Sequence, residues 1–269
     1  MNDRPTVFHI THQKAGSQWI SALLKSCAPD RYVPNQTMGA HYNQNPIKIG
    51  HVYPCLYLAK PNFEALIGSN WGLNRPQYKN ILRSPQTYIA NWYNFQMQNK
   101  EHRKFIVIRD LRDALVSAYF SFKISHPVKT KNLHRWRENL QSLDREKGFI
   151  YLMDEVLQRW ANIQLSWLDN ECLLIKYEDL VNNQYETIET IMEHCQIDIE
   201  RQRLQEIVKS HSFENKTGRK KGEEDIASHE RKGIAGDWQN HFSEGIKEEF
   251  KQRFGTVLIQ TGYEKDINW

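Results

Sequence analysis

Short apolar runs alternate with segments that place apolar residues on one helical face. Thr6–Ile10 and Phe105–Ile108 have the length and the β-branched and aromatic content of buried parallel strands. Each is followed by helical spacing of apolar residues, first in Ser17–Leu24 and then from Ala114 to Phe122. The pattern therefore predicts two strand-to-helix units that follow the same plan.

Further along the chain, Leu173–Ile175 predicts a third buried strand and Asn80–Leu82 a weaker fourth. Helical spacing recurs in residues 150–168, 180–195, 199–210 and 244–260. Strands that alternate with helices, without a Pro/Gly-rich linker, are typical of one α/β domain. We therefore expect residues 1–269 to form a single three-layer α/β domain around a central parallel, doubly wound sheet of the P-loop nucleotide-binding type.

Ligands of doubly wound sheets bind at the carboxyl ends of the strands. The loops after Ile10, Ile108 and Ile175 should accordingly converge on one site. A second expectation concerns Phe213–Trp238, which combines four glycines with many charged residues. We expect this segment to be a long mobile loop that closes over a ligand.

Hydrophobic residues make up 39% and charged residues 25% of the 269 residues, and the mean hydropathy is −0.72. These values exclude a membrane-embedded protein, and Asp3 and Arg4 stand where a signal peptide would need apolar residues. The four cysteines lie far apart and form no C-x-x-C pair, which argues against a zinc site and against a disulfide framework. We expect a cytoplasmic protein with reduced thiols, no metal and no membrane partner.

Positive charge is concentrated in one segment, although the net charge is only +4. Residues 103–137 contain nine Lys and Arg against two Asp, a local charge of +7. Such a segment suggests a specific anionic ligand, although a charged run is more often a solvated face. No nucleic-acid partner is expected, and a salt-dependent DNA shift would test that alternative.

The link between the first strand and the first helix has the composition of an anion-binding loop. In residues 11–19, Lys14 is followed by Gly16 and by Ser17, where the helix begins. Backbone N–H groups and the helix dipole favour an anion at such a position. The nucleotide-triphosphatase pattern G-x-x-x-x-G-K-S/T is not matched, because Lys14 precedes Gly16 and no glycine lies upstream. ATP or GTP hydrolysis is therefore disfavoured.

Five blocks carry a combined pattern, namely Lys14–Trp19, Arg109–Tyr119, Tyr177–Leu180, His211–Phe213 and Arg231–Phe242. In this order they resemble the motifs of the PAPS-dependent sulfotransferase family of the cytosolic type. Its members transfer a sulfuryl group from 3′-phosphoadenosine-5′-phosphosulfate (PAPS). The first block is similar to the family's 5′-phosphosulfate loop, the second to its 3′-phosphate segment and the last to its R-K-G-x-x-G-D-W loop. The blocks span most of the chain.

The resemblance implies that two groups of residues bind PAPS. The 5′-phosphosulfate would be held by Lys14, Ala15, Gly16, Ser17, Gln18 and Trp19. At the 3′-phosphate, Arg109 would supply a planar cation and Ser117 a hydroxyl. Arg231 and Lys232 would add charge to the same phosphate, and Gly233 would add a backbone N–H.

The same resemblance places the adenine between Trp19 and Phe213, beside Ser212, with Tyr177 hydrogen-bonded to the base. Stacking on flat side chains favours binding by about 1–3 kcal/mol per base. Purely structural roles are the alternatives: helix core for Trp19, and, for Arg109, a helix-capping ion pair within the group Arg109, Asp110, Arg112 and Asp113. Asp237–Trp238 is expected to tie the loop to the body of the protein.

Sulfuryl transfer resembles phosphoryl transfer, in which catalysis is mostly positioning and electrostatic stabilisation. Lys14 would stabilise the negative charge that grows on the leaving oxygen. The base that removes the acceptor's proton is, in the family, a histidine upstream of the arginine that Arg109 matches. Pro85 occupies that position here and cannot accept a proton. The candidate substitutes are His51 and His126, with Glu64 as a carboxylate option.

From Tyr53 to Phe95, 9 of 43 residues are aromatic, which is 21% against 12% overall. An aromatic-lined pocket suits a small aromatic or lipid-like acceptor, although core packing explains aromatic residues equally well. The sequence predicts a sulfotransferase that acts on a hydroxyl or amine of such an acceptor. The alternatives are a catalytically silent PAP- or PAPS-binding protein on the same scaffold and another P-loop phosphotransferase. The oligomeric state is left open.

Overall fold

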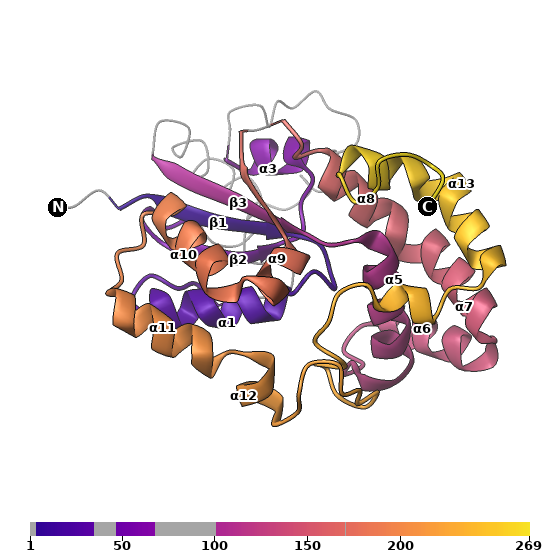
Figure 1. Ribbon diagram of the computed structural model, residues 1–269. Coiled ribbons are helices and arrows are strands. Elements are labelled where there is room, and N and C mark those ends of the chain that lie inside the picture. Colours follow the sequence, from indigo (N-terminus) through magenta and orange to yellow (C-terminus); the bar gives the residue numbers. More distant parts are fainter. Residues whose placement is uncertain (1–3, 35–46, 68–100, 170) are drawn as a thin grey trace.

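The computed structural model describes residues 4–34, 47–67, 101–169 and 171–269, and in this part four parallel strands form one sheet (Figure 1). The strands are β1 (Thr6–Thr11), β2 (Val52–Leu56), β3 (His102–Ile108) and β4 (Leu173–Lys176). Their order across the sheet is β2-β1-β3-β4. Val7 of β1 is paired with Val52 on one side and with Arg103 on the other, and all three strand pairs are parallel. The predicted parallel α/β fold is confirmed.

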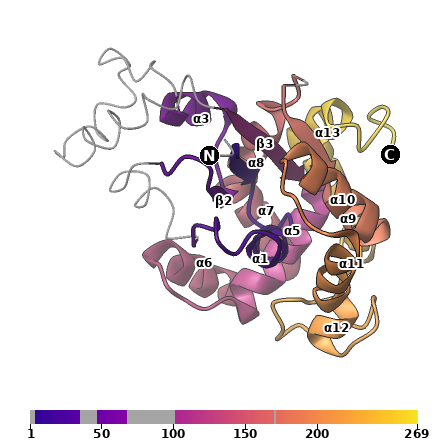
Figure 2. The same ribbon diagram turned by 90° about the vertical axis from the view of Figure 1, so that its left-hand side faces the viewer.

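Helices flank the sheet and also gather beyond one end of it (Figures 1 and 2). The first ones in chain order are α1 (Ser17–Cys27), α3 (Lys60–Ile67), α5 (Leu111–Phe120), the π-helix η3 (Ser121–Ser125), α6 (Lys131–Ser142) and α7 (Arg145–Leu152). They are followed by the π-helix η4 (Met153–Leu157), α8 (Gln158–Leu165), α9 (Tyr177–Asn182), α10 (Gln184–His194) and α11 (Arg201–Ser210). The last ones are α12 (Phe213–Thr217), the 3-10 helix η5 (Asp237–Asn240) and α13 (Glu244–Gln260).

Both faces of the sheet are buried, because successive residues of each strand point to opposite faces and every residue of β1 and β2 and the second half of β3 is buried. On one face, Val7 and Val107 belong to a cluster with residues of α1, α10 and α11. On the other face, Phe8 and Ile106 pack with Phe63 of α3 and with residues of α8. The sheet is thus the middle layer of three.

A third apolar cluster joins the helices beyond the sheet. It contains residues of α5, α7, α8 and α13 and the side chains of Trp238 and Phe242. Because α5 starts directly after β3, this cluster fixes the helix that continues from the carboxyl edge of the sheet.

The structure departs from the predicted elements at several places. Strand β2 contains Pro54, which interrupts a strand pattern but is tolerated where a strand lies at the edge, as β2 does in the described sheet. Its pairing with β1 shifts register between Phe8 and Ile10, and Cys55 there has a φ of 59°. Helix α6 was not predicted, and 213–238 includes α12 and part of η5 rather than loop alone. The strand expected at Asn80–Leu82 lies outside the described residues.

Candidate functional site

The loop between β1 and α1 contains two residues with left-handed backbone conformation, Lys14 with a φ of 70° and Gly16 with a φ of 77°. Gly16 is the N-cap of α1 and supplies no side-chain cap, and the first turn of α1 contains no acidic residue. The first N–H groups of a helix have no partner within it. Together with the helix dipole they form a site that favours an anion.

A buried polar network that includes residues of α8 supports this loop. The amide of Gln164 donates to Nε2 of His12 (2.8 Å) and to the carbonyl of Arg109 (2.7 Å). Nδ1 of His12 donates to the carbonyl of Gln13 (2.8 Å), whose side-chain oxygen accepts from Nε1 of Trp160 (2.6 Å). Burial lowers the pKa of His12 to about 4, so this histidine is neutral. No sequence motif marked Gln164 or Trp160, because they lie on α8, far along the chain.

Arg109 connects the first loop to the loop after β3. Its Nη1 donates to the carbonyl of Lys14 (3.0 Å), and its Nη2 lies 4.0 Å from the carboxylate of Asp113. The residue is only 8% exposed, and its Nε is buried without a hydrogen-bond partner among the described residues. An unused donor on a buried guanidinium fits an anionic ligand.

Tyr177, directly after β4, completes the convergence of the three loops. The guanidinium of Arg109 lies 4.2 Å from the centre of the Tyr177 ring. The same ring packs edge-on against Trp19, with centroids 6.3 Å apart, and a Cβ at Gly16 would come within 3.0 Å of it. The expected convergence of the loops after the first, second and third predicted strands is therefore confirmed. Nε1 of Trp19 is another buried donor without a partner in the described part of the chain.

The remaining residues of the first block have different surroundings. Ala15 is fully buried, and Gln18 is exposed. The hydroxyl of Ser17 is hydrogen-bonded to the hydroxyl of Tyr57 (2.9 Å), which follows β2. Burial raises the pKa of Tyr57 to about 12, so it is a neutral phenol.

Positive charges crowd around Lys14, which is half-buried. Its pKa is lowered to about 7, mainly by burial and further by the charges of Arg109 and Arg231, while Glu230 raises it. Arg231 is more than a hundred residues away in sequence from Arg109, so the fold brings separate cations to one lysine. An anion bound there would relieve their repulsion.

We define the Arg231 loop as Gly218–Gly236, between α12 and η5. Asp113 of α5 anchors its end, because the carboxylate accepts hydrogen bonds from the backbone N–H groups of Gly236 (2.6 Å) and Trp238 (2.9 Å). Within the loop, the N–H of Gly222 donates to the carbonyl of Lys232 (2.9 Å). The segment is thus tied both to itself and to α5.

Carboxylates already neutralise two of the three cations that were predicted to bind the 3′-phosphate. Arg231 pairs with Glu224 and Asp237, and Lys232 pairs with Asp237 (2.6 Å). Hydrogen bonds from His241, Lys232 and Arg231 hold the pKa of Asp237 far below its usual range, although burial opposes this shift. An incoming phosphate would have to share Arg231 with these groups or displace Glu224.

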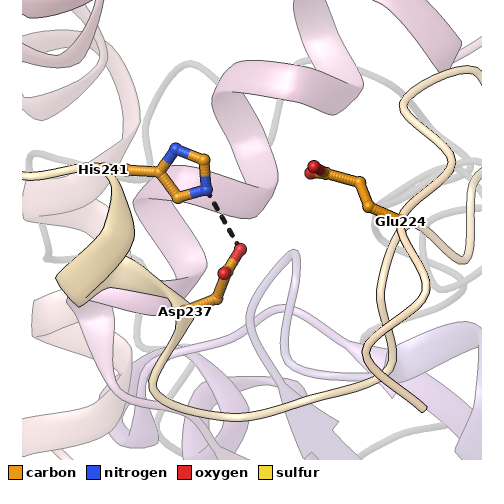
Figure 3. Close-up of side chains that lie close together, drawn as sticks. All are labelled: Glu224, Asp237 and His241. Carbon is orange, nitrogen blue, oxygen red and sulfur yellow. Dashed lines mark hydrogen bonds and ion pairs between the residues drawn. The ribbon is translucent and has the colours of Figure 1, made fainter.

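Figure 3 shows Glu224, Asp237 and His241 close together, with His241 directed at Asp237. These three residue types are common metal ligands, but Arg231 bridges the two carboxylates and supplies the positive charge between them. Nε2 of His241 is 3.1 Å from Asp237. The arrangement is explained as an ion-pair network that shapes the Arg231 loop, and we assign no metal to it.

Of the other residues predicted to contact the nucleotide, Phe213 lies against this loop, whereas Ser212 and Ser117 lie on neighbouring elements. A Cβ at Gly233, which has a φ of 65°, would meet the ring of Phe213 at 2.5 Å. The hydroxyl of Ser212 accepts from the N–H of Asn215 (3.2 Å) and caps α12. Ser117 lies half-buried on α5, three residues before Phe120, whose ring is 4.6 Å from the Arg231 guanidinium.

The candidate bases have contrasting positions. His51 precedes β2, and its carbonyl accepts from the N–H of Val7 (2.9 Å), so it lies at the amino edge of the parallel sheet. Lys14 follows the carboxyl end of β1, at the opposite edge, and the geometry therefore does not support His51 as the base. His126 follows η3, and Lys14 contributes to lowering its pKa to about 4, although burial is the larger cause.

Pro85 lies outside the described residues, as do most of the aromatic residues of the expected acceptor region. Of the three that are described, Tyr53 and Phe63 are buried against Phe8, and Tyr57 is bonded to Ser17. Core packing, the alternative interpretation, thus explains two of the three.

The positive segment 103–137 divides into separate roles. Arg112 is buried between Asp110 (2.6 Å) and Glu264 (2.6 Å), and Asp110 caps α5 by accepting from the N–H of Arg112. Arg135 pairs with Glu155 (2.6 Å). The helix-capping interpretation is therefore right for Asp110 and Arg112, whereas Arg109 reaches the first loop.

Fold and site together define a parallel α/β protein of the class that binds phosphate groups at the loop after its first strand. Residues 4–262 match the family model described as "Sulfotransferase domain", and the chain belongs to that family. In the described part of the chain, no helix is both long enough and apolar enough to cross a membrane.

Individual relatives are distant. Rat sulfotransferase 1E1 is 23% identical over 258 residues, which cover 91% of this chain and 80% of that protein. Human sulfotransferase 1C2 is 23% identical over 90% of this chain and 79% of its own length. Human sulfotransferase 2A1 is 27% identical over 157 residues, 55% of this chain and 53% of that protein.

Solved structures show the same fold. Mouse sulfotransferase SULT7A1, crystallised with PAP, aligns with a TM-score of 0.59 at 17% identity and covers 95% of this chain and 84% of that one. Retinol dehydratase in complex with retinol and PAP aligns with a TM-score of 0.51 at 16% identity and covers 95% and 82%.

Proposed function

We propose that this protein transfers a sulfuryl group from PAPS to a hydroxyl or amine of a small acceptor. The convergence of Arg109 and Arg231 on Lys14 carries the proposal, because it creates an anion site from three distant segments. The unpartnered buried donors of Arg109 and Trp19 fit a ligand with phosphate and aromatic parts. PAPS combines both.

Each part of the site has a task in this proposal. The N–H groups at the start of α1 and the Lys14 ammonium bind the 5′-phosphosulfate, and Lys14 stabilises the charge that grows on the leaving oxygen. Arg109, Ser117, Arg231, Lys232 and Gly233 bind the 3′-phosphate. The base stacks on Trp19 and meets Tyr177, Ser212 and Phe213.

The relatives support the nucleotide more strongly than the acceptor. Two structures with this fold contain PAP, the product that PAPS leaves behind, and one of them also contains retinol. We therefore infer a small, largely apolar acceptor, aromatic or lipid-like. The four cysteines are buried free thiols, which is consistent with our inference of a cytoplasmic location.

Radiolabelled PAPS tests the proposal with a panel of phenols and alcohols. We expect labelled sulfated product and PAP in equal amounts, and loss of product with Lys14→Ala. Tight PAP binding without transfer to any acceptor would instead identify a silent nucleotide-binding protein. Binding of ATP with transfer of its phosphate would replace the proposal with a phosphotransferase.

A further inference from the structure

Two histidines from separate segments lie beside each other near Lys14. His126 follows η3, and His229 belongs to the Arg231 loop, two residues before Arg231. Their ring centroids are 6.0 Å apart. The charge of Lys14 acts on both imidazoles. His229 is outside the five sequence blocks, so only the fold reveals this pair.

The backbone of His126 is held on both sides while its ring has few partners. Its N–H donates to the carbonyl of Ser121 (2.8 Å), and its carbonyl accepts from Arg137 (2.5 Å). The ring packs edge-on against Phe122, with centroids 6.2 Å apart. Its Nδ1 is buried without a hydrogen-bond partner among the described residues. Nδ1 is therefore closed to an acceptor, whereas Nε2 is neither buried in this way nor hydrogen-bonded among the described residues. Nε2 is the nitrogen of this fixed imidazole that a proton donor can reach.

Burial and nearby positive charges keep both rings neutral in the free protein. Burial is the largest cause that lowers the pKa of His126 to about 4, and the positive charges of Lys14, Arg137 and Lys129 add to it. Around His229, burial and the charges of Lys14 and Lys216 lower the pKa, and Glu230 opposes them. A phosphosulfate bound at Lys14 would offset that positive charge and raise the pKa of His126 toward its ordinary value, where a neutral imidazole accepts a proton effectively at neutral pH.

Exposed apolar side chains lie close in sequence to both histidines. Ile124 and Val128 flank His126 in the chain and are 40% and 41% exposed, and Ile226, three residues before His229, is 47% exposed. Exposed apolar groups beside neutral imidazoles suit an acceptor with an apolar body and one hydroxyl.

We propose that His126 is the general base of the transfer and that His229 passes the proton on to solvent. This inference rests on the proposed function. The acceptor's O–H proton moves to Nε2 of His126, while the acceptor oxygen bonds to sulfur. The bond from sulfur to the 5′-phosphate oxygen breaks, and that oxygen keeps the electron pair as PAP. His229 is the more solvent-accessible of the two histidines and can exchange the proton with water.

Turnover of wild type is compared with His126→Asn, His229→Asn and the control His134→Asn, whose histidine is exposed and pairs with Glu138 on α6. His126→Asn should lower kcat about 100- to 1000-fold with PAP affinity unchanged, and less for more acidic phenols, which need less help from a base. His229→Asn should lose about tenfold, partly restored by added imidazole. The control should keep the wild-type rate.

If His126→Asn lost the same factor in kcat with every phenol, or lost none, the inference would be overturned. Turnover by the wild type would still support the proposed function in that case. Absence of wild-type transfer would reject both.

NMR titration of the histidine rings gives a readout that needs no turnover. In Lys14→Met, the pKa of His126 and His229 should rise toward the ordinary value. Unchanged titration of His126 and His229 would contradict the placement of this pair beside Lys14.

Discussion

The fold determines both the backbone conformation and the pKa of Lys14. Its left-handed backbone is held by the bond from Arg109 to its carbonyl, and its ammonium is surrounded by the charges that lower its pKa to about 7. In the free protein it is therefore only partly charged at neutral pH. A bound phosphosulfate would stabilise the ammonium and raise this pKa.

Nucleotide affinity should consequently depend on pH. Because the complex has the higher lysine pKa, binding takes up a proton above pH 7, and affinity falls by up to about tenfold per pH unit as pH rises toward 9. Calorimetry of PAP binding in buffers of different ionisation enthalpy measures this uptake. Lys14→Arg, which stays charged, should abolish the dependence. A wild-type affinity that is constant from pH 7 to 9 would contradict the role given to Lys14.

At the scale of elements, the Arg231 loop carries residues proposed to bind the nucleotide, and contacts within the loop and with α5 hold it in place. Asp113 on α5 fixes its end, Phe213 covers Gly233, and Glu224 competes for Arg231. The loop thus has its shape before any ligand binds. Ligand affinity then depends on the free energy needed to break these contacts, such as the ion pair between Glu224 and Arg231.

Replacing Glu224 should strengthen binding. In Glu224→Gln the carboxylate no longer pairs with Arg231, so affinity for PAP should rise about two- to fivefold, the scale of a partly exposed ion pair. Affinity for adenosine 5′-monophosphate, which lacks the 3′-phosphate, should not change. Binding titrations with both nucleotides decide the matter, and an equal gain for both would show that Glu224 does not oppose the 3′-phosphate.

Two glycines of the loop provide a matched pair. Gly218 and Gly233 have φ values of 72° and 65°, but only Gly233 faces a neighbour that a Cβ would strike. Gly218→Ala should cost about 1–2 kcal/mol of unfolding free energy from backbone strain alone. Gly233→Ala should cost more and should also weaken PAP binding, because Phe213 must move. Chemical denaturation and PAP titration measure both, and identical behaviour of the two variants would refute the packing argument.

At the scale of the molecule, the sequence predicted the central strands because their apolar runs are buried on both faces. It missed β2, where Pro54 interrupts the pattern, and α6, whose buried residues are only Leu133 and Leu140. The phosphate loop and Arg109 were predictable because each belongs to a motif of consecutive residues. The support from Gln164 and the approach of His229 were not, because both depend on packing between distant segments.

Buried neutral histidines make the whole molecule sensitive to acid. Burial lowers the pKa of His9 to about 3 and that of His12 to about 4, against 6.5 when unfolded. The unfolded chain binds protons first as pH falls, so the free energy of unfolding should decrease below pH 6.5 by about 1.4 kcal/mol per pH unit for each histidine. Denaturation curves of wild type, His9→Asn and the exposed control His134→Asn test this. The slope should decrease only in His9→Asn, and an unchanged slope there would contradict it.

The central claim is that one site binds both the 5′-phosphate and the 3′-phosphate of a nucleotide. Calorimetric titration with PAP and with adenosine 5′-monophosphate, which lacks the 3′-phosphate, tests this claim most directly. The account predicts that PAP binds at least 100-fold more tightly, and that alanine at Lys14 or at Arg109 weakens PAP binding severely. Equal affinity for the two nucleotides, or undiminished PAP affinity in both variants, would contradict it.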